Sequence, residues 1–152
     1  MAASVLMVCL GNICRSPLAE AALRAHVDRQ GLDVEIDSAG TGDWHVGHAP
    51  DPRAQEVARR LGGIDVSILA ARQLAVEDFE RYDHIVAMDQ SNLSNVKSMA
   101  PAASTAKISL LLDHLPGHEG QPVPDPYYGE LRDFENVWRL VDKATAALVR
   151  KL

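Results

Sequence analysis

Two residue types near the start of the chain could do chemistry together, a cysteine and an arginine. Cys9 and Arg15 are separated by five residues in VCLGNICRSPLAEA, which spans residues 8–21, and a serine follows the arginine. A loop of this length can curl so that successive backbone N–H groups point inward and hold a tetrahedral oxyanion. Gly11 and Asn12 favour such a curl because both tolerate positive φ. The guanidinium of Arg15 can bind two oxygens of one phosphate, which a lysine cannot do.

Cys9 would lie at the bottom of this loop, where it could act as a nucleophile. The donors that hold an anion also stabilise a thiolate, and a thiolate in this position would attack the phosphorus of a bound phosphate. The hydroxyl of Ser16 could stabilise the same thiolate and help it leave in a second step. Taken singly, a cysteine at the end of a buried strand is typically inert, and an arginine on a helix is typically a solvated charge. Their combination in one turn favours a catalytic phosphate site.

The residues of the turn argue against two other interpretations. A nucleotide P-loop requires the pattern G-x-x-x-x-G-K-[ST], which is absent from the sequence. A zinc site requires a second close pair of ligands beside Cys9 and Cys14, and the histidines are scattered along the chain. The sequence therefore predicts no metal ion and no cofactor.

The leaving group of a phosphate monoester needs a proton, so a general acid should approach from another loop. The best candidate is Asp125 in VPDPYYGE, where a proline on each side stiffens the backbone. Tyr127 and Tyr128 follow it and could form a wall for an aromatic ligand. Taken alone, DPYYG is typical of a plain turn. Asp51 also precedes a proline, but it is better explained as a helix N-cap with proline at the first helical position.

Trp44, in TGDWHVG, lies on a glycine-rich segment and could form the opposite wall of the pocket. The alternative is a tryptophan that caps the core. The neighbouring His45 and His48 are predicted to be surface residues without a metal-binding or catalytic role. Trp138 is predicted to be a core residue of the last helix.

Length and composition limit the classes of protein that need to be considered. The chain has 152 residues, which fits one domain over residues 1–152, and it is 47% hydrophobic and 24% charged. A formal net charge of −6 argues against nucleic-acid binding and against anchoring on anionic lipid. No apolar run approaches the ~20 residues that span a bilayer, and the first residues lack the basic region of a secretory signal. With only two cysteines, a reducing cytoplasm is the expected location.

Strand patterns alternate with helix patterns along the chain, which predicts a parallel sheet connected by right-handed crossovers. The expected strands are residues 4–8, 33–36, 83–87 and 107–111. The expected helices are residues 16–30, 52–61, 76–81, 90–99 and 133–151, with loops at 38–50 and 112–130. Ser16 is expected as the N-cap of the first helix, Pro17 as its first residue and Gly31 as its end. The predicted fold is an open, doubly wound α/β sheet of four parallel strands flanked by helices. Ligands of such sheets bind at the carboxyl ends of the strands, where the phosphate-binding loop follows the first strand.

At this point the chain resembles the low-molecular-weight protein tyrosine phosphatases, and its short loops favour a bacterial-type member. The matching segments are VCLGNICRSPLAEA at 8–21, DSAGTGDWHVG at 37–47, ARQL at 71–74, DHIVAMDQSNL at 83–93 and DPYYG at 125–129.

The resemblance implies a role for most of the residues named above. Cys9 corresponds to the nucleophile, Arg15 to the phosphate-binding arginine and Asp125 to the acid that later activates water. Asn12 and Ser38 correspond to a pair that supports the strained turn. The predicted substrate-contacting residues are Leu10, Gly11, Asn12, Ile13, Cys14, Ser16, Trp44, Tyr127 and Tyr128.

Three further positions are informative within the resemblance. Cys14 corresponds to a cysteine that can trap oxidised Cys9 as a disulfide. Asp89 falls in a motif near the site, but the sequence does not define its role. Some family members have a histidine at the position of Leu69 that supports the loop serine, and a leucine cannot donate that hydrogen bond. The hydrogen bond that this histidine gives to the serine is therefore expected to be absent here or supplied by another residue, with little effect on the chemistry.

The predicted activity is metal-independent hydrolysis of phosphotyrosine and small aryl phosphates in two steps. The Cys9 thiolate displaces the tyrosine oxygen while Asp125 donates a proton, and Asp125 then activates the water that hydrolyses the phosphocysteine. The expected partner is a phosphotyrosine-containing protein, and the chain is expected to be a monomer or a weak homo-oligomer.

Two alternatives stay open from the sequence. Arsenate reduction uses a similar anion site but ends in a cascade through two further thiols, and only Cys14 is left here. A non-catalytic phosphotyrosine-binding module would have no use for an intact nucleophile and acid.

Overall fold

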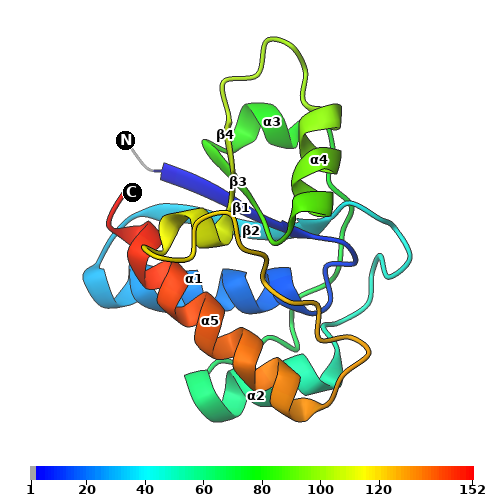
Figure 1. Cartoon of the computed structure of the whole chain (residues 1–152), viewed down its shortest axis with the longest axis vertical. Coiled ribbons are helices and arrows are strands. Elements are labelled where there is room, and N and C mark those ends of the chain that lie inside the picture. The colour runs from blue at the N-terminus through cyan, green and yellow to red at the C-terminus, as the bar shows by residue number, and fades with distance from the viewer. Residues whose placement is uncertain (1–2) are drawn as a thin grey trace.

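The computed structural model describes residues 3–152 and is built around a four-stranded sheet (Figure 1). The strands are β1 (Ala3–Cys9), β2 (Val34–Gly40), β3 (His84–Ala87) and β4 (Lys107–Leu110). All neighbouring pairs are parallel, and the strand order is β2-β1-β3-β4. The predicted four-stranded parallel α/β architecture is confirmed. Strand β1 lies between β2 and β3, so the connections run to opposite sides of β1, and the loop after β1 lies where ligands of such folds bind.

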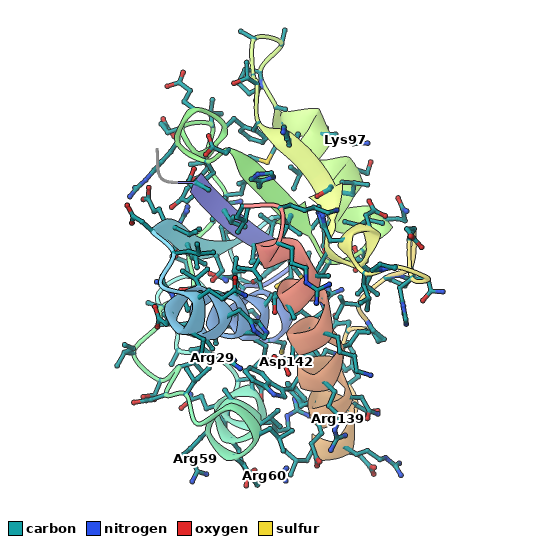
Figure 2. All side chains as sticks on the ribbon, turned by 90° about the vertical axis from the view of Figure 1, so that its left-hand side faces the viewer. Arg29, Arg59, Arg60, Lys97, Arg139 and Asp142 are labelled. Atoms are coloured by element: carbon teal, nitrogen blue, oxygen red, sulfur yellow. The ribbon has the colours of Figure 1, made fainter. Side chains whose placement is uncertain are left out.

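Helices cover both faces of the sheet. On one face α1 (Arg15–Gln30) packs against α5 (Leu131–Val149), and both contact α2 (Pro52–Gly62). Figure 2, a quarter-turn from Figure 1, shows α5 alongside α1, with α2 below α1 and beside the lower end of α5. On the other face lie α3 (Asp78–Arg81) and α4 (Gln90–Met99), and the 3-10 helix η1 (Leu111–His114) follows β4 directly. No helix within residues 3–152 is both long enough and apolar enough to cross a membrane.

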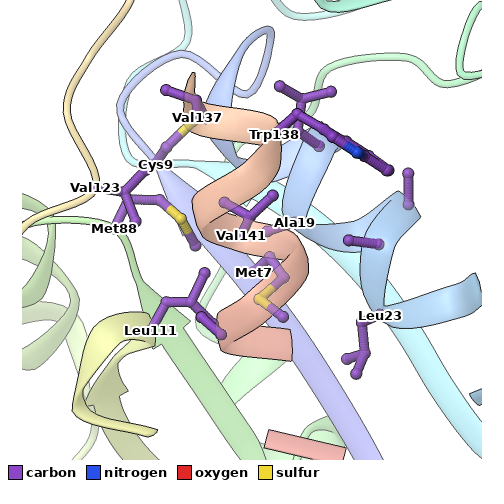
Figure 3. Close-up of a cluster of buried hydrophobic side chains, with 14 of the residues drawn as sticks. Met7, Cys9, Ala19, Leu23, Met88, Leu111, Val123, Val137, Trp138 and Val141 are labelled. Carbon is purple, nitrogen blue, oxygen red and sulfur yellow. The ribbon is translucent and has the colours of Figure 1, made fainter. Parts of the chain in front are cut away.

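The side chains of β1 divide between two cores because successive residues of a strand point to opposite faces. Met7 and Cys9 pack with α1 and α5 in the larger core (Figure 3), whereas Leu6 and Val8 pack with the smaller core on the α3 and α4 face. A strand buried on both faces reads as a continuous apolar run, which is why the sequence predicted it. Trp138 is buried in the larger core, as predicted.

Local signals explain most helix ends, but one predicted cap is wrong. Gly31 ends α1 in the left-handed conformation at φ 65°, and Asp51 caps α2 by accepting a hydrogen bond from the Arg53 backbone N–H at 2.9 Å. The N-cap of α1 is Cys14, without a side-chain hydrogen bond, so Ser16 is not the cap and Pro17 is not the first helical residue. The Ser16 hydroxyl is instead committed to the site described below.

Four other predicted boundaries shift. Strand β2 continues to Gly40, into the predicted loop 38–50, because it pairs with the whole of β1 up to Cys9. Of the predicted helix 76–81, only the residues of α3, 78–81, are helical. The first residues of the predicted loop 112–130 belong to the 3-10 helix η1. The last helix starts at Leu131, two residues earlier than predicted, after a turn in which Asp133 accepts a hydrogen bond from the Glu130 N–H at 2.7 Å.

Candidate active site

The loop between β1 and α1 is shaped by one residue with positive φ. Asn12 has φ 57°, and it is the only residue other than glycine with positive φ in the described part of the chain. Its backbone N–H consequently turns inward and donates to the Sγ of Cys9 at 3.3 Å. The predicted positive φ at Gly11 is wrong. A side chain at this position would crowd His45, because a Cβ would lie 3.0 Å from its imidazole Cδ2.

The Asn12 side chain holds this conformation from behind the loop. Its Nδ2 donates to the hydroxyls of Ser16 and Ser38, each at 2.9 Å. Its Oδ1 accepts from the backbone N–H of Arg72 at 3.0 Å. A left-handed non-glycine residue costs of order 1 kcal/mol or more, so it persists only where the surroundings fix it. The predicted pairing of Asn12 with Ser38 is present in the structure.

The thiol of Cys9 lies 3.0 Å from the Oγ of Ser16. Since Ser16 already accepts from Asn12, its own hydrogen is free to point at the sulfur. The sulfur thus faces a backbone N–H and a hydroxyl, two donors that favour a negative charge. Cys9 is only 3% exposed, so a reacting group must reach it at the bottom of a pocket.

Arg15 is fixed by groups that follow β3 and precede α5. Its Nη1 donates to Asp89 Oδ2 at 2.7 Å and to the backbone carbonyl of Val123 at 3.1 Å. The other Asp89 oxygen caps α4 by accepting from the Asn92 N–H at 2.8 Å. Asp89 is therefore a positioning residue for Arg15, a role that the sequence left undefined.

Asp125 approaches the same guanidinium from the loop before α5. Its Oδ2 lies 3.7 Å from Arg15 Nη2, and its Oδ1 accepts from the Tyr127 N–H at 3.1 Å. The side chain is partly exposed, which leaves an oxygen free to meet a ligand. The structure therefore brings the three predicted catalytic side chains, Cys9, Arg15 and Asp125, to one pocket.

The loop that carries Asp125 is tied down by Arg53 of α2. The guanidinium of Arg53 donates to the backbone carbonyls of Tyr127 and Gly129, both at 2.9 Å. Asp51 holds the guanidinium in place at 3.0 Å, and the ring of Phe134 lies 4.4 Å from it. Sequence reasoning treated Asp51 only as a cap and missed Arg53, because its partners are backbone atoms more than 70 residues away.

The pocket has a volume of about 280 Å³ and mostly apolar walls around Cys9. Its lining residues are Cys9, Leu10, Gly11, Ile13, Cys14, Arg15, Trp44, His45, Asp125, Tyr127 and Tyr128. Of the predicted substrate-contacting residues, only Asn12 and Ser16 are outside this set, since they support the loop from behind.

Aromatic residues from two loops form the rim of the pocket. Tyr127 and Tyr128 make an edge-to-face pair with ring centroids 5.0 Å apart, and Tyr128 is 96% exposed. Trp44 is 68% exposed and lines the pocket, so the alternative of a core-capping tryptophan is wrong. His45 was predicted to be a surface residue, but it is half-buried and its ring centroid lies 6.3 Å from that of Tyr127. His48 is exposed, as predicted.

Glu20 supplies the support that Leu69 cannot give. The Ser38 hydroxyl donates to Glu20 Oε1 at 2.6 Å, and Arg24 Nε donates to Oε2 at 3.0 Å. Burial raises the pKa of Glu20, and the bonds from Ser38 and Arg24 oppose this shift. Leu69 packs against the core beside this network. Ser38 of β2, which supports Asn12, is therefore held by a carboxyl group of α1.

Cys14 differs from Cys9 although both thiols are free and buried. Burial raises the pKa of Cys14 strongly, and the charge of Asp51 raises it further. Its thiol is consequently protonated at neutral pH, whereas the proposed attack on phosphorus needs a thiolate.

The chain matches known proteins along its whole described length. The family model "Low molecular weight phosphotyrosine protein phosphatase" matches residues 4–152. A low molecular weight phosphotyrosine protein phosphatase of Schizosaccharomyces pombe is 47% identical over 142 residues, covering 91% of this chain and 90% of the relative. The low molecular weight protein-tyrosine-phosphatase YfkJ of Bacillus subtilis is 42% identical, covering 98% and 95%.

Solved structures agree with this result. A protein tyrosine phosphatase from Entamoeba histolytica, crystallised with Hepes in its active site, superposes with a TM-score of 0.92 at 34% identity, covering 99% of this chain and 96% of that one. The loop geometry, the pocket and these matches lead to one conclusion: the chain belongs to the low molecular weight phosphotyrosine protein phosphatase family.

Proposed function

We propose that this phosphatase hydrolyses phosphotyrosine in proteins, and small aryl phosphates, through a phosphocysteine on Cys9. The observation that carries the proposal is the convergence of a buried thiol, a fixed guanidinium and a carboxyl group on one pocket with aromatic walls. In the first step the Cys9 thiolate attacks phosphorus, the bond to the tyrosine oxygen breaks, and Asp125 donates its proton to that oxygen.

In the second step Asp125, now a carboxylate, takes a proton from a water molecule. That water attacks the phosphocysteine, the S–P bond breaks, and phosphate and the Cys9 thiolate are released. Arg15 and the inward N–H groups of the loop stabilise the equatorial oxygens in both transition states. Ser16 is placed to donate to the departing sulfur.

The depth of the catalytic pocket favours phosphotyrosine over phosphoserine as the substrate. Cys9 lies at the bottom of the pocket, while Trp44 and Tyr128 are the most exposed aromatic residues of its rim. A phenyl ring spans this depth and packs against aromatic walls, whereas a short serine side chain would hold its phosphate away from the sulfur. We expect turnover of a phosphotyrosine peptide and none of the matched phosphoserine peptide.

The assignment of the acid can be tested with two leaving groups. Replacing a general acid typically costs about 10²–10⁴ in rate. Asp125→Asn should lose this factor on phosphotyrosine, and much less on p-nitrophenyl phosphate, because nitrophenolate leaves without a proton. Asp33→Asn, an exposed carboxyl outside the pocket, is the matched control and should be unchanged on both substrates. Equal losses of Asp125→Asn on the two substrates would contradict the acid role.

The nucleophile is tested directly by Cys9→Ser. This variant should lose hydrolysis but keep phosphate binding, and unchanged turnover would overturn the mechanism. The same variant, or Asp125→Ala, can retain a phosphoprotein substrate from a lysate for identification.

A cytoplasmic location, supported by two free thiols, and a monomeric or weakly associating state remain part of the proposal.

A further inference from the structure

A groove lies between the loop that carries Asp125 and the first turns of α5. Its volume is about 360 Å³, compared with about 280 Å³ for the catalytic pocket. Asp125 and Tyr128 line both hollows, so the loop forms a common wall between them. Figure 1 shows this loop, in orange, running beside α5 before it enters the helix. The hollow, called the α5 groove below, is lined by Pro124, Asp125, Pro126, Tyr128, Gly129, Asp133, Asn136, Val137 and Leu140.

One wall of the α5 groove is a single face of the helix. The four α5 residues that line it follow the spacing i, i+3, i+4, i+7, which places them in one stripe: Asp133, Asn136, Val137 and Leu140. Val137 is buried in the larger core, Leu140 is partly buried against it, and Asn136 is exposed. The helix thus presents an apolar surface to the groove beside one exposed amide.

The opposite wall, the loop itself, is held in place from two directions. A proline on each side of Asp125 restricts its backbone. The guanidinium of Arg53 donates to the carbonyls of Tyr127 and Gly129, both at 2.9 Å. At Gly129 a Cβ would collide with the side chain of Asp133, so the loop meets the start of α5 in close contact. The α5 groove is therefore bounded by fixed elements.

Apolar atoms form most of the accessible surface of the α5 groove, although two carboxylates line it. Each carboxylate is engaged by the backbone next to it. Asp125 Oδ1 accepts from the Tyr127 N–H at 3.1 Å, and Asp133 Oδ2 accepts from the Glu130 N–H at 2.7 Å. The other side chains of the groove carry no charge, which favours an apolar occupant.

Continuity with the catalytic pocket identifies this occupant. A protein substrate whose phosphotyrosine reaches Cys9 must carry its neighbouring residues over the rim, where Tyr128 is 96% exposed. An extended chain covers about 10 Å in three residues, whereas one strand of backbone occupies about 5 Å. A residue within three positions of the phosphotyrosine can therefore cross the loop and place its side chain on the far side.

We propose that the α5 groove binds an apolar side chain of the protein substrate, about the size of leucine, within three residues of the phosphotyrosine. The inference rests on the proposed function, because it requires a phosphotyrosine in the catalytic pocket. The side chain packs between the Tyr128 ring and Leu140. The groove thus sets a sequence preference around the phosphotyrosine and takes no part in the chemistry.

A set of phosphotyrosine peptides tests this preference. Each peptide carries one leucine at a different position within three residues of the phosphotyrosine, in a background of glycine and serine. Leucine at one position should raise kcat/KM about tenfold over the background peptide, chiefly through KM, as expected for the partial burial of its side chain. Lysine at the same position should give no such gain.

A matched pair of variants assigns the preference to the groove. Asn136→Trp fills the groove from an exposed position and should remove the preference for leucine. Lys143→Trp is the control, because this exposed residue lies about 10 Å further along the same face of α5 and outside the groove. Both variants should hydrolyse p-nitrophenyl phosphate like wild type, since that substrate is too small to enter the α5 groove.

The outcomes separate this inference from the proposed function. No leucine effect at any position, a preference for lysine over leucine, or a leucine preference that survives Asn136→Trp would each overturn the inference while p-nitrophenyl phosphate turnover stayed intact. Wild-type protein that hydrolysed none of the phosphotyrosine peptides would overturn the proposed function, and the inference with it.

Discussion

Asp89→Asn tests whether Arg15 depends on its carboxylate partner. The two oxygens of Asp89 serve two different donors, Arg15 at 2.7 Å and the Asn92 N–H at 2.8 Å. An amide has only one oxygen, so asparagine can cap α4 but must then turn its NH₂ group toward the guanidinium. Arg15 keeps only the carbonyl of Val123 as a close partner and loses its orientation toward the phosphate.

The size of the effect follows from the bond that is lost. A hydrogen bond to a charged group contributes about 1.5–3 kcal/mol, and each ~1.4 kcal/mol changes a rate about tenfold. We therefore expect kcat/KM for p-nitrophenyl phosphate to fall about 10- to 100-fold. Because Arg15 also binds product, the inhibition constant for inorganic phosphate should rise in parallel.

Stability and catalysis can be separated with a second substitution. Asp89→Ala removes the cap as well, which typically costs about 1 kcal/mol of stability, while its loss of activity should resemble that of Asp89→Asn. Asp33→Asn serves as the control for removing a carboxylate. If Asp89→Asn kept kcat/KM and the phosphate inhibition constant within about twofold of wild type, the positioning role would be refuted.

Four further outcomes are expected. Ser38→Ala leaves the buried Glu20 network without its hydroxyl and should cost about 1–3 kcal/mol in urea denaturation; no change would mean that the network adds nothing to stability. The pH profile of kcat/KM should be bell-shaped, because the first step uses Cys9 as the nucleophile and Asp125 as the proton donor; a rate that rises without a falling limb would contradict the acid assignment. Burial and nearby Lys151 lower the pKa of His114 in the folded protein below its usual 6.5. The neutral imidazole therefore stabilises the fold above pH 6.5, and this stability is lost as the pH falls through the pKa of the folded state. His114→Gln should make the free energy of unfolding less dependent on pH in this range. Mild peroxide should produce a Cys9–Cys14 disulfide, seen as the loss of two hydrogens by mass spectrometry, whereas sulfinic acid on Cys9 would argue against protective pairing.

The parts of the site that the sequence predicted are those whose chemistry is local. Cys9 and Arg15 lie on one strand–loop–helix unit, so their spacing predicts a shared anion site without knowledge of the fold. Asp125 was found because the reaction needs a proton donor and its loop has an unusual sequence. The error at Ser16 arose because a cap and a thiolate donor use the same hydroxyl, and local sequence cannot decide which partner it takes.

The roles that the sequence did not define mostly involve residues far apart in the sequence. Arg15 and Asp89 are 74 positions apart, and Asp89 carried only the local signal of a helix cap after a strand. Glu20 carried a signal that could have been used, a lone carboxyl among the small and apolar residues PLAEAAL, which indicates a buried acid with a partner. His45 gave no such signal, because its place in the pocket depends on how two loops meet.

The order of the strands explains why these distant residues meet at one place. Strand β1 is central, and its carboxyl end carries Cys9. Its two neighbours, β2 and β3, end at the same edge of the sheet because all strands are parallel, so Ser38 of β2 and Asp89 after β3 reach the loop from opposite sides. One supports the strained turn through Asn12, and the other fixes Arg15. An antiparallel neighbour would place its carboxyl end at the far edge, and the loop would lose one of these supports. The parallel arrangement thus brings both supports of the loop, the one behind Asn12 and the one beside Arg15, to the same edge of the sheet.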